Sequence, residues 1–218
     1  MTYDDLPAII PIFPLSEVLL LPGGVLPLNI FEEKYVRMIE DVLGTHRMIG
    51  IVQPDEKARD QGSKDALLKT GCVGRISQFS ETEDNRYLIM LKGVIRFEIG
   101  EEVSNILPYR QAEVNWKPYQ DDIVEDCDTI EIDRDYFLPL LFRYLDMHDI
   151  ECDREIIKQS PCEVLLTTLP MICPFDAKEK QALLEAKTLD NRYETLTTII
   201  SLALNSYSDT ASITPLRH

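Results

Sequence analysis

The stretch LPAIIPIFPLSEVLLLPGGVLPLNIF, residues 6–31, decides the fold of this chain. It contains five prolines, and a proline inside a helix removes a backbone donor and clashes with the preceding turn, so a helix is excluded here. Most of the other residues are aliphatic, and they flank the turn sequence Pro22-Gly23-Gly24. Short apolar runs bounded by Pro and Gly are typical of strands. The stretch therefore predicts short extended segments at the start of the chain.

The period of the apolar residues changes after residue 31. Between residues 32 and 43 they recur at helical spacing while charged residues take the opposite face, which predicts an amphipathic helix that ends at Gly44. The charged segment 54–64 is expected to be a surface loop, and Asp84-Asn85 suits a tight hairpin turn. Strands are expected at residues 48–52, 73–79, 86–91, 95–99 and 109–114.

An acidic segment separates this β-rich part from a helical one. Residues 121–135 contain eight carboxylates, whose repulsion should keep a linker open, and they lack the spaced ligands and glycine of a calcium loop. Capping-box patterns begin at Ser160 and at Asp176. Helices are expected at residues 136–145, 161–169 and 178–187 and from residue 190 onwards. The sequence thus predicts an α+β protein with a β-rich part at 1–120, a linker at 121–135, a helical subdomain at 136–205 and a frayed tail at 206–218.

Charge and cysteine content restrict the partners and the compartment. The formal net charge of −16 should repel phosphate backbones, so nucleic acid is disfavoured as a partner. The five cysteines form an odd set without a C-x-x-C pair, as in proteins of a reducing cytosol rather than in disulfide frameworks or zinc sites. Neither a basic, apolar leader nor about 18 continuous apolar residues occur. These features predict a cytoplasmic protein without a membrane segment.

The sequence offers no set of residues that indicates catalysis. The histidines His46, His148 and His218 are far apart in the chain, and no nucleophile and base accompany them in a known spacing. A phosphate-binding G-x-x-x-x-G-K loop is also missing. We therefore expect neither an enzyme nor a bound cofactor or metal.

Several segments resemble the Lon N-terminal (Lon substrate-binding) domain, especially its stand-alone bacterial form. At the start these are IFPL at 12–15, LPGGVLPL at 21–28 and IFEEKY at 30–35, although Asn29 departs from the His often seen there. The segments that resemble the strands and helices further along are GCVGRI at 71–76, DNRYL at 84–88, GVIRF at 93–97, PYR at 108–110, KQALLE at 180–185 and NRYETL at 191–196. The resemblance implies a PUA-like β pseudo-barrel with one early helix, followed by a C-terminal helical subdomain.

The resemblance also implies a function in protein recognition. In Lon the corresponding domain helps to select unfolded or degron-bearing polypeptides, so we expect a non-catalytic binding module whose partners are such polypeptides or a cellular protease. The ATPase and Ser-Lys protease parts of Lon have no counterpart in these residues. A client could pair with a strand edge or fill an apolar groove. The first contact candidates are Phe31, Tyr35, Phe79 and Tyr109, for which core packing is the alternative.

Three other interpretations stay open at this point. The chain could regulate a full-length protease, for example by competing for its clients. It could bind RNA, since PUA-like folds include RNA modules, although its charge and the lack of basic, aromatic strands argue against this. It could also be a hydrolase whose site is assembled from distant residues.

Overall fold

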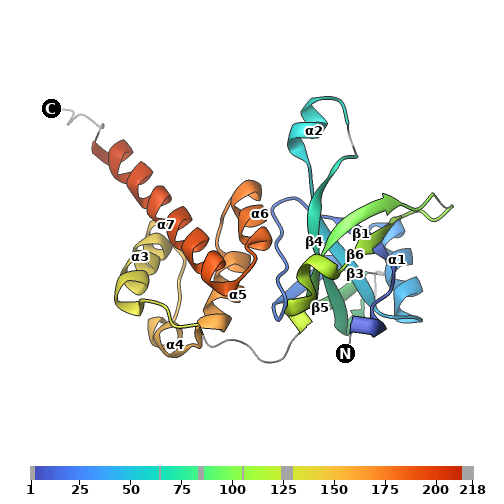
Figure 1. The fold of residues 1–218 in the computed structure, drawn as a ribbon, viewed down its shortest axis with the longest axis horizontal. Coiled ribbons are helices and arrows are strands. Elements are labelled where there is room, and N and C mark those ends of the chain that lie inside the picture. The colour runs from blue at the N-terminus through green and yellow to red at the C-terminus, as the bar shows by residue number, and fades with distance from the viewer. Residues whose placement is uncertain (1–2, 64, 83–85, 105, 124–129, 213–218) are drawn as a thin grey trace. The chain divides into compact units, whose positions relative to one another are not determined.

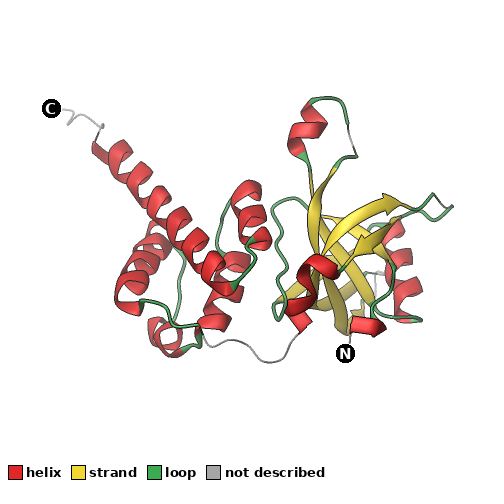
Figure 2. Ribbon diagram, viewed as in Figure 1, coloured by secondary structure: helices red, strands yellow, loops and turns green. Residues whose placement is uncertain are grey.

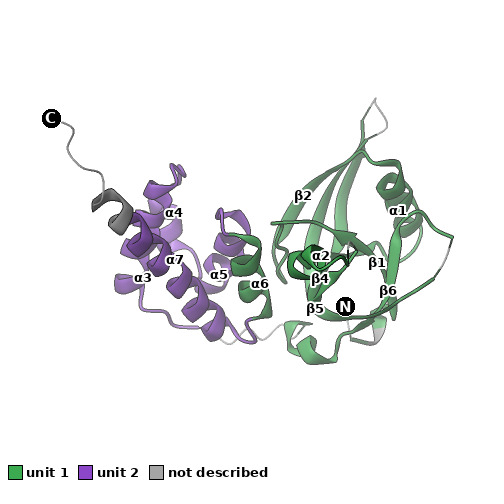
Figure 3. Ribbon diagram, turned by 90° about the horizontal axis from the view of Figure 1, so that it is seen from above, with its two compact units in different colours: residues 1–127, 176–185 green, residues 128–175, 186–218 purple. Residues whose placement is uncertain are grey.

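The computed structural model describes residues 3–63, 65–82, 86–104, 106–123 and 130–212. Contacts divide the chain into two compact units, which Figure 3 colours separately. Unit 1 comprises residues 1–127 together with 176–185, and unit 2 comprises residues 128–175 and 186–218. In the part of the chain that is described, no helix is long and apolar enough to cross a membrane.

Unit 1 is built on a six-stranded sheet with the order β2-β5-β4-β3-β1-β6 (Figure 1). The β1–β3 pair is parallel, whereas the other pairs are antiparallel. An additional pairing between β5 and β6 curls the sheet back on itself. The strands are β1 (Ile9–Pro14), β2 (Val25–Ile30), β3 (Met48–Pro54), β4 (Leu67–Glu81), β5 (Tyr87–Glu102) and β6 (Arg110–Asn115). The expected α+β class is confirmed, and the opening stretch supplies β1 and β2.

The strands β4 and β5 are longer than the sequence predicted. We expected two strands at residues 86–91 and 95–99, but β5 continues through Gly93 because that glycine fits into the sheet at an irregular register. A Cβ atom at Gly93 would lie 2.0 Å from the carbonyl oxygen of Leu21, so only glycine allows this close approach of the two backbones. The expected hairpin at Asp84-Asn85 lies outside the described residues.

The core of unit 1 lies inside the curled sheet. Ile10, Val73, Ile95 and Phe97 are fully buried, and the Phe97 ring packs edge-on against Trp116 with a centroid distance of 5.6 Å. The indole N–H of Trp116 donates to the carbonyl of Pro7 at 3.1 Å, which satisfies its polar atom. The opening stretch thus contributes to the core through Ile10, and its residues Leu19, Leu20 and Leu21 are buried as well.

Helices flank this sheet (Figure 2). The predicted amphipathic helix is confirmed as α1 (Glu33–Leu43), which buries Met38, Ile39 and Val42. The segment expected to be a loop contains a short helix, because the Asp55 side chain accepts a hydrogen bond from the Ala58 amide and caps it. The remaining helices of unit 1 are η1 (Tyr3–Asp5), α2 (Glu56–Asp60), η2 (Lys117–Ile123) and α6 (Ala177–Glu185).

The regular elements in the described part of unit 2 are helices: α3 (Arg134–Met147), α4 (Arg154–Gln159), α5 (Cys162–Ile172) and α7 (Leu189–Ser212). The long helix α7 packs against α3 and α5, with Leu196 and Ile200 fully buried. It continues to Ser212, beyond residue 206, where we expected a frayed tail to begin. Residues 213–218 of that tail, and 124–129 of the acidic linker, lie outside the described residues.

Of the two predicted capping boxes, one is confirmed and one is wrong. The amide of Glu179 donates to the Asp176 carboxylate and the amide of Asp176 donates to the Glu179 carboxylate, each at 2.8 Å. Ser160 instead donates its hydroxyl to the carbonyl of Ile156 at the end of α4, and Pro161 takes the N-cap position of α5. The sequence did not indicate α4, which uses this serine.

Candidate functional site

The histidines and carboxylates of the described residues form no group that could hold a metal ion. His46 accepts a hydrogen bond from the Met48 amide through Nδ1 at 2.9 Å, and burial lowers the pKa of its imidazole. His148 ends α3 and its ring lies 4.5 Å from that of Tyr144. Each of these histidines thus has a local structural contact.

Two of the four predicted contact residues lie against the core. Tyr109 is only 6% exposed, and its hydroxyl donates to the Asp41 carboxylate at 2.9 Å. Burial and this hydrogen bond raise the pKa of Tyr109 to about 12. Tyr35 is half-buried, with its ring centroid 4.1 Å from that of Phe13 on β1. Both tyrosines therefore fasten α1 to the sheet.

The other two predicted residues are exposed. Phe31 is 65% exposed and Phe79 is 51% exposed. The Phe79 ring lies 6.5 Å from that of Tyr87, and Tyr87 is the register partner of Ile30, the residue before Phe31. The structure thus brings Phe31 and Phe79 to the same end of the β2–β5–β4 part of the sheet.

The same three strands also carry a surface that the sequence analysis did not identify. Successive strand residues point to opposite faces, and on β5 the buried Ile89 and Leu91 alternate with the outward-facing Leu88, Met90 and Lys92. The strand register aligns these three with outward residues of β2 and β4. We call this set the outer face; it consists of Val25, Pro27 and Asn29 on β2, Leu88, Met90 and Lys92 on β5, and Arg75, Gln78 and Ser80 on β4.

The centre of the outer face is apolar and accessible. Val25 and Leu88 are each about half exposed, and Pro27 and Met90 lie in the row between them. Clusters of exposed apolar side chains with a polar rim are typical of interaction sites. The outer face is therefore a candidate binding surface.

The charge of the outer face differs from that of the chain as a whole. None of its nine residues is acidic, although the chain has a formal net charge of −16. Its charged residues are Arg75 and Lys92, which are register partners, and neither is in an ion pair with any residue that the structure describes. The surface can thus attract a segment that is apolar or acidic.

One edge of this surface is a strand edge. Among the described strands, β2 pairs only with β5 and forms the end of the sheet order. Its outer edge can pair with a further extended strand, except at Pro27, which has no backbone N–H. Alternation in the sequence V-L-P-L-N-I could have indicated two faces of β2, but its pairing with β5 could not be inferred from that pattern.

Comparisons with known proteins agree on one family. The model of the ATP-dependent protease La (LON) substrate-binding domain matches residues 9–201. The Lon protease of Flavobacterium johnsoniae is 34% identical over 114 residues, which cover 52% of this chain and 14% of that protein. Lon protease 2 of Myxococcus xanthus is 34% identical over 129 residues, which cover 59% of this chain and 14% of that protein. The match thus spans about one seventh of the length of these relatives.

Solved structures show the same fold. The Lon N-terminal domain protein from Xanthomonas campestris has a TM-score of 0.61 at 20% identity and covers 87% of this chain and 97% of its own. The N-terminal domain of Mycobacterium avium complex Lon protease has a TM-score of 0.60 at 17% identity, with coverages of 88% and 98%. At these identities the likeness concerns the fold.

Proposed function

Because this chain belongs to the ATP-dependent protease La (LON) substrate-binding domain family, we propose that it binds polypeptides that expose apolar segments. The observation that carries the proposal is the outer face, where Val25, Pro27, Leu88 and Met90 form an accessible apolar surface beside the free edge of β2. An extended client would pair with β2 and lay alternate side chains on this face. Folded proteins bury such segments, so the surface would select unfolded or degron-bearing polypeptides.

Binding of this kind should be weak and reversible. Burying about 300 Å² of apolar surface contributes roughly 7 kcal/mol. Association costs about 4–15 kcal/mol in lost freedom, so hydrogen bonds along β2 must add to the apolar term. We expect dissociation constants on the order of 10–100 μM, which suit a module that samples many clients.

Three of the four residues predicted from the sequence have a role in this proposal. Phe31 follows Ile30 at the end of β2 and extends the contact at the Tyr87 end of the strands, because an exposed aromatic ring provides a large contact area. Phe79 pairs with Ile89 and so lies on the face of the sheet opposite to Leu88, outside this contact. Tyr35 and Tyr109 hold α1, which begins two residues after Phe31, and so position that ring. The role is recognition in the cytoplasm without catalysis by these residues, and the partners are client polypeptides or a protease that degrades them.

The proposal can be tested by fluorescence anisotropy. The unfolded probe is a separate protein that is labelled, reduced and carboxymethylated. The full chain should bind the probe, and the double variant Val25→Thr/Leu88→Thr should bind about five- to tenfold more weakly because two apolar side chains leave the contact. Ile156→Thr is the matched control, since Ile156 is an exposed apolar residue of α4 in unit 2. Absence of binding by the wild type would reject the function, whereas equal binding by the double variant would reject the outer face alone.

A further inference from the structure

Unit 1 is completed by a helix from a distant part of the chain. The helix α6 groups with the sheet, although the residues on both sides of it, up to 175 and from 186, belong to unit 2. The chain therefore passes between the units after residue 127, after residue 175 and after residue 185. The sequence-based division had placed α6 with the other helices, because its contacts with the sheet cannot be seen in its periodicity.

Polar groups, most of them buried, fasten α6 to the sheet at several points. The side-chain amide of Gln53 donates through Nε2 to the carbonyl of Ala177 at 3.0 Å and to the side-chain oxygen of Gln181 at 3.1 Å. Gln181 in turn donates to the carbonyl of Thr70 on β4 at 3.2 Å. The ammonium of Lys180 donates to the carbonyl of Glu17 at 2.7 Å. These contacts explain why Lys180 and Gln181 are buried, and they fix the first half of α6.

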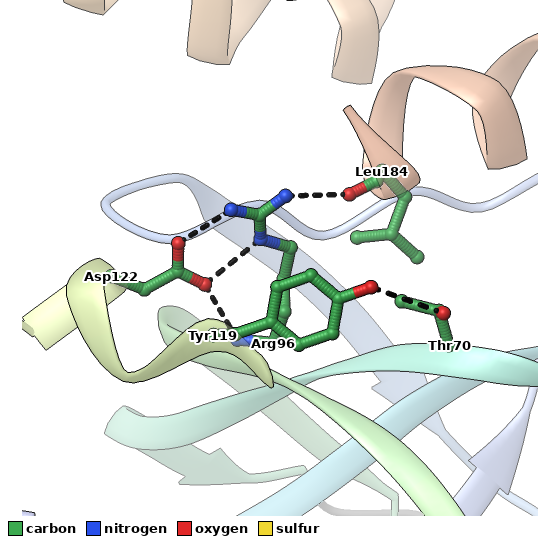
Figure 4. Close-up of polar contacts among 5 residues, drawn as sticks. All are labelled: Thr70, Arg96, Tyr119, Asp122 and Leu184. Atoms are coloured by element: carbon green, nitrogen blue, oxygen red, sulfur yellow. Dashed lines mark hydrogen bonds and ion pairs between the residues drawn. The ribbon is translucent and has the colours of Figure 1, made fainter. Parts of the chain in front are cut away.

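The far end of α6 is held by an arginine that also holds η2 (Figure 4). The Arg96 guanidinium donates to the carbonyl of Leu184 at 3.0 Å through one nitrogen. Its other nitrogens donate to the Asp122 carboxylate at 2.9 and 2.7 Å, and the Arg96 amide donates to the same carboxylate. The ring of Tyr119 stacks on the guanidinium at 4.5 Å and restricts it further.

The positions of these two partners in the chain give the contact its meaning. Leu184 is two residues before the crossing into unit 2 at residue 186, and Asp122 lies in η2, the last described element before the crossing after residue 127. One side chain, 4% exposed and anchored on β5, thus bonds to two segments of unit 1 that are far apart in the chain. We propose that Arg96 is a conformational lock that couples α6 to η2, so that a weaker hold on one of these segments also loosens the other from the sheet.

The test uses Asp122→Asn in the full chain, because this change removes the charge from the η2 side without altering any group on α6. The lock requires that a weaker hold on the guanidinium also weakens its bond to Leu184. Amide hydrogen exchange should therefore become about tenfold faster in α6 as well as in η2, while exchange in α1 and α3 stays unchanged.

Two further variants make the result decisive. Arg110→Met removes another arginine–carboxylate pair of unit 1, with Glu102, and should change exchange neither in α6 nor in η2. Arg96→Lys keeps a charge but loses the bidentate geometry, so it should reproduce the effect of Asp122→Asn. Faster exchange confined to η2, or the same changes in Arg110→Met, would overturn the proposal.

Discussion

The outer face and the α6 contact are built in opposite ways from the same sheet. On the outer face, apolar side chains such as Leu88 and Met90 are left accessible. At the α6 contact, polar side chains such as Gln53 and Arg96 are withdrawn from water and hydrogen-bonded. A buried polar group without its partner is costly, so the α6 contact demands one arrangement, whereas an accessible apolar face accepts varied partners. The difference separates the part of unit 1 that maintains its structure from the part that is free to bind.

The largest expected effect is that of Arg96→Met. The substitution leaves the Asp122 carboxylate and the Leu184 carbonyl without this partner in a buried place. Breaking a buried ion pair from one side costs about 3–5 kcal/mol, so the free energy of unfolding should fall by that amount in urea titrations. A loss below about 1 kcal/mol would show that the arginine cluster is not the rigid part of unit 1.

A smaller loss is expected for Gln181→Leu at the middle of α6. The Thr70 carbonyl and the Gln53 side chain would each lose a hydrogen-bond partner, at a cost of about 1–3 kcal/mol. Because the outer face is not altered, binding of the unfolded probe should stay at the wild-type level. Weaker binding in this variant would contradict the separation of the two regions.

Tyr109→Phe tests whether a residue first considered for binding belongs to the structural part. Loss of the hydrogen bond to Asp41 should lower the free energy of unfolding by about 1 kcal/mol and leave probe binding unchanged. The folded-state pKa of Tyr109 is about 12 against 10.0 for an ordinary tyrosine, so the unfolded state ionises first. The contribution of Tyr109 to the free energy of unfolding is therefore complete below pH 10 and is lost as the pH rises towards 12. Denaturation measured across this range should show a smaller alkaline loss in the phenylalanine variant.

The smallest effect on stability is expected for Leu88→Thr on the outer face. Threonine suits a strand, and the site is half exposed, so the free energy of unfolding should change by no more than about 0.5 kcal/mol. Thermal denaturation and probe binding should therefore diverge, with stability kept and binding reduced. A stability loss as large as that of Gln181→Leu would mean that the outer face is also a packed surface.

Patterns within one element were readable from the sequence. The prolines of residues 6–31 excluded a helix, and the apolar spacing of residues 32–43 gave α1 nearly to the residue. The capping box at Asp176 was correct because both of its partners lie within four residues. The box at Ser160 was wrong because the preceding helix α4, which was not anticipated, uses the serine hydroxyl.

The sequence by itself determined the α+β class, the order of the main elements and the family, because these depend on local periodicity and on motifs that are continuous in the chain. The outer face depends on the register that places Leu88 beside Asn29 and Met90 beside Pro27. The membership of α6 in unit 1 depends on Arg96 and Gln53, which are more than 80 residues away from their partners on that helix. Only the tertiary structure decided these features, because hydrogen bonds and packing between distant segments leave no periodic trace in the sequence.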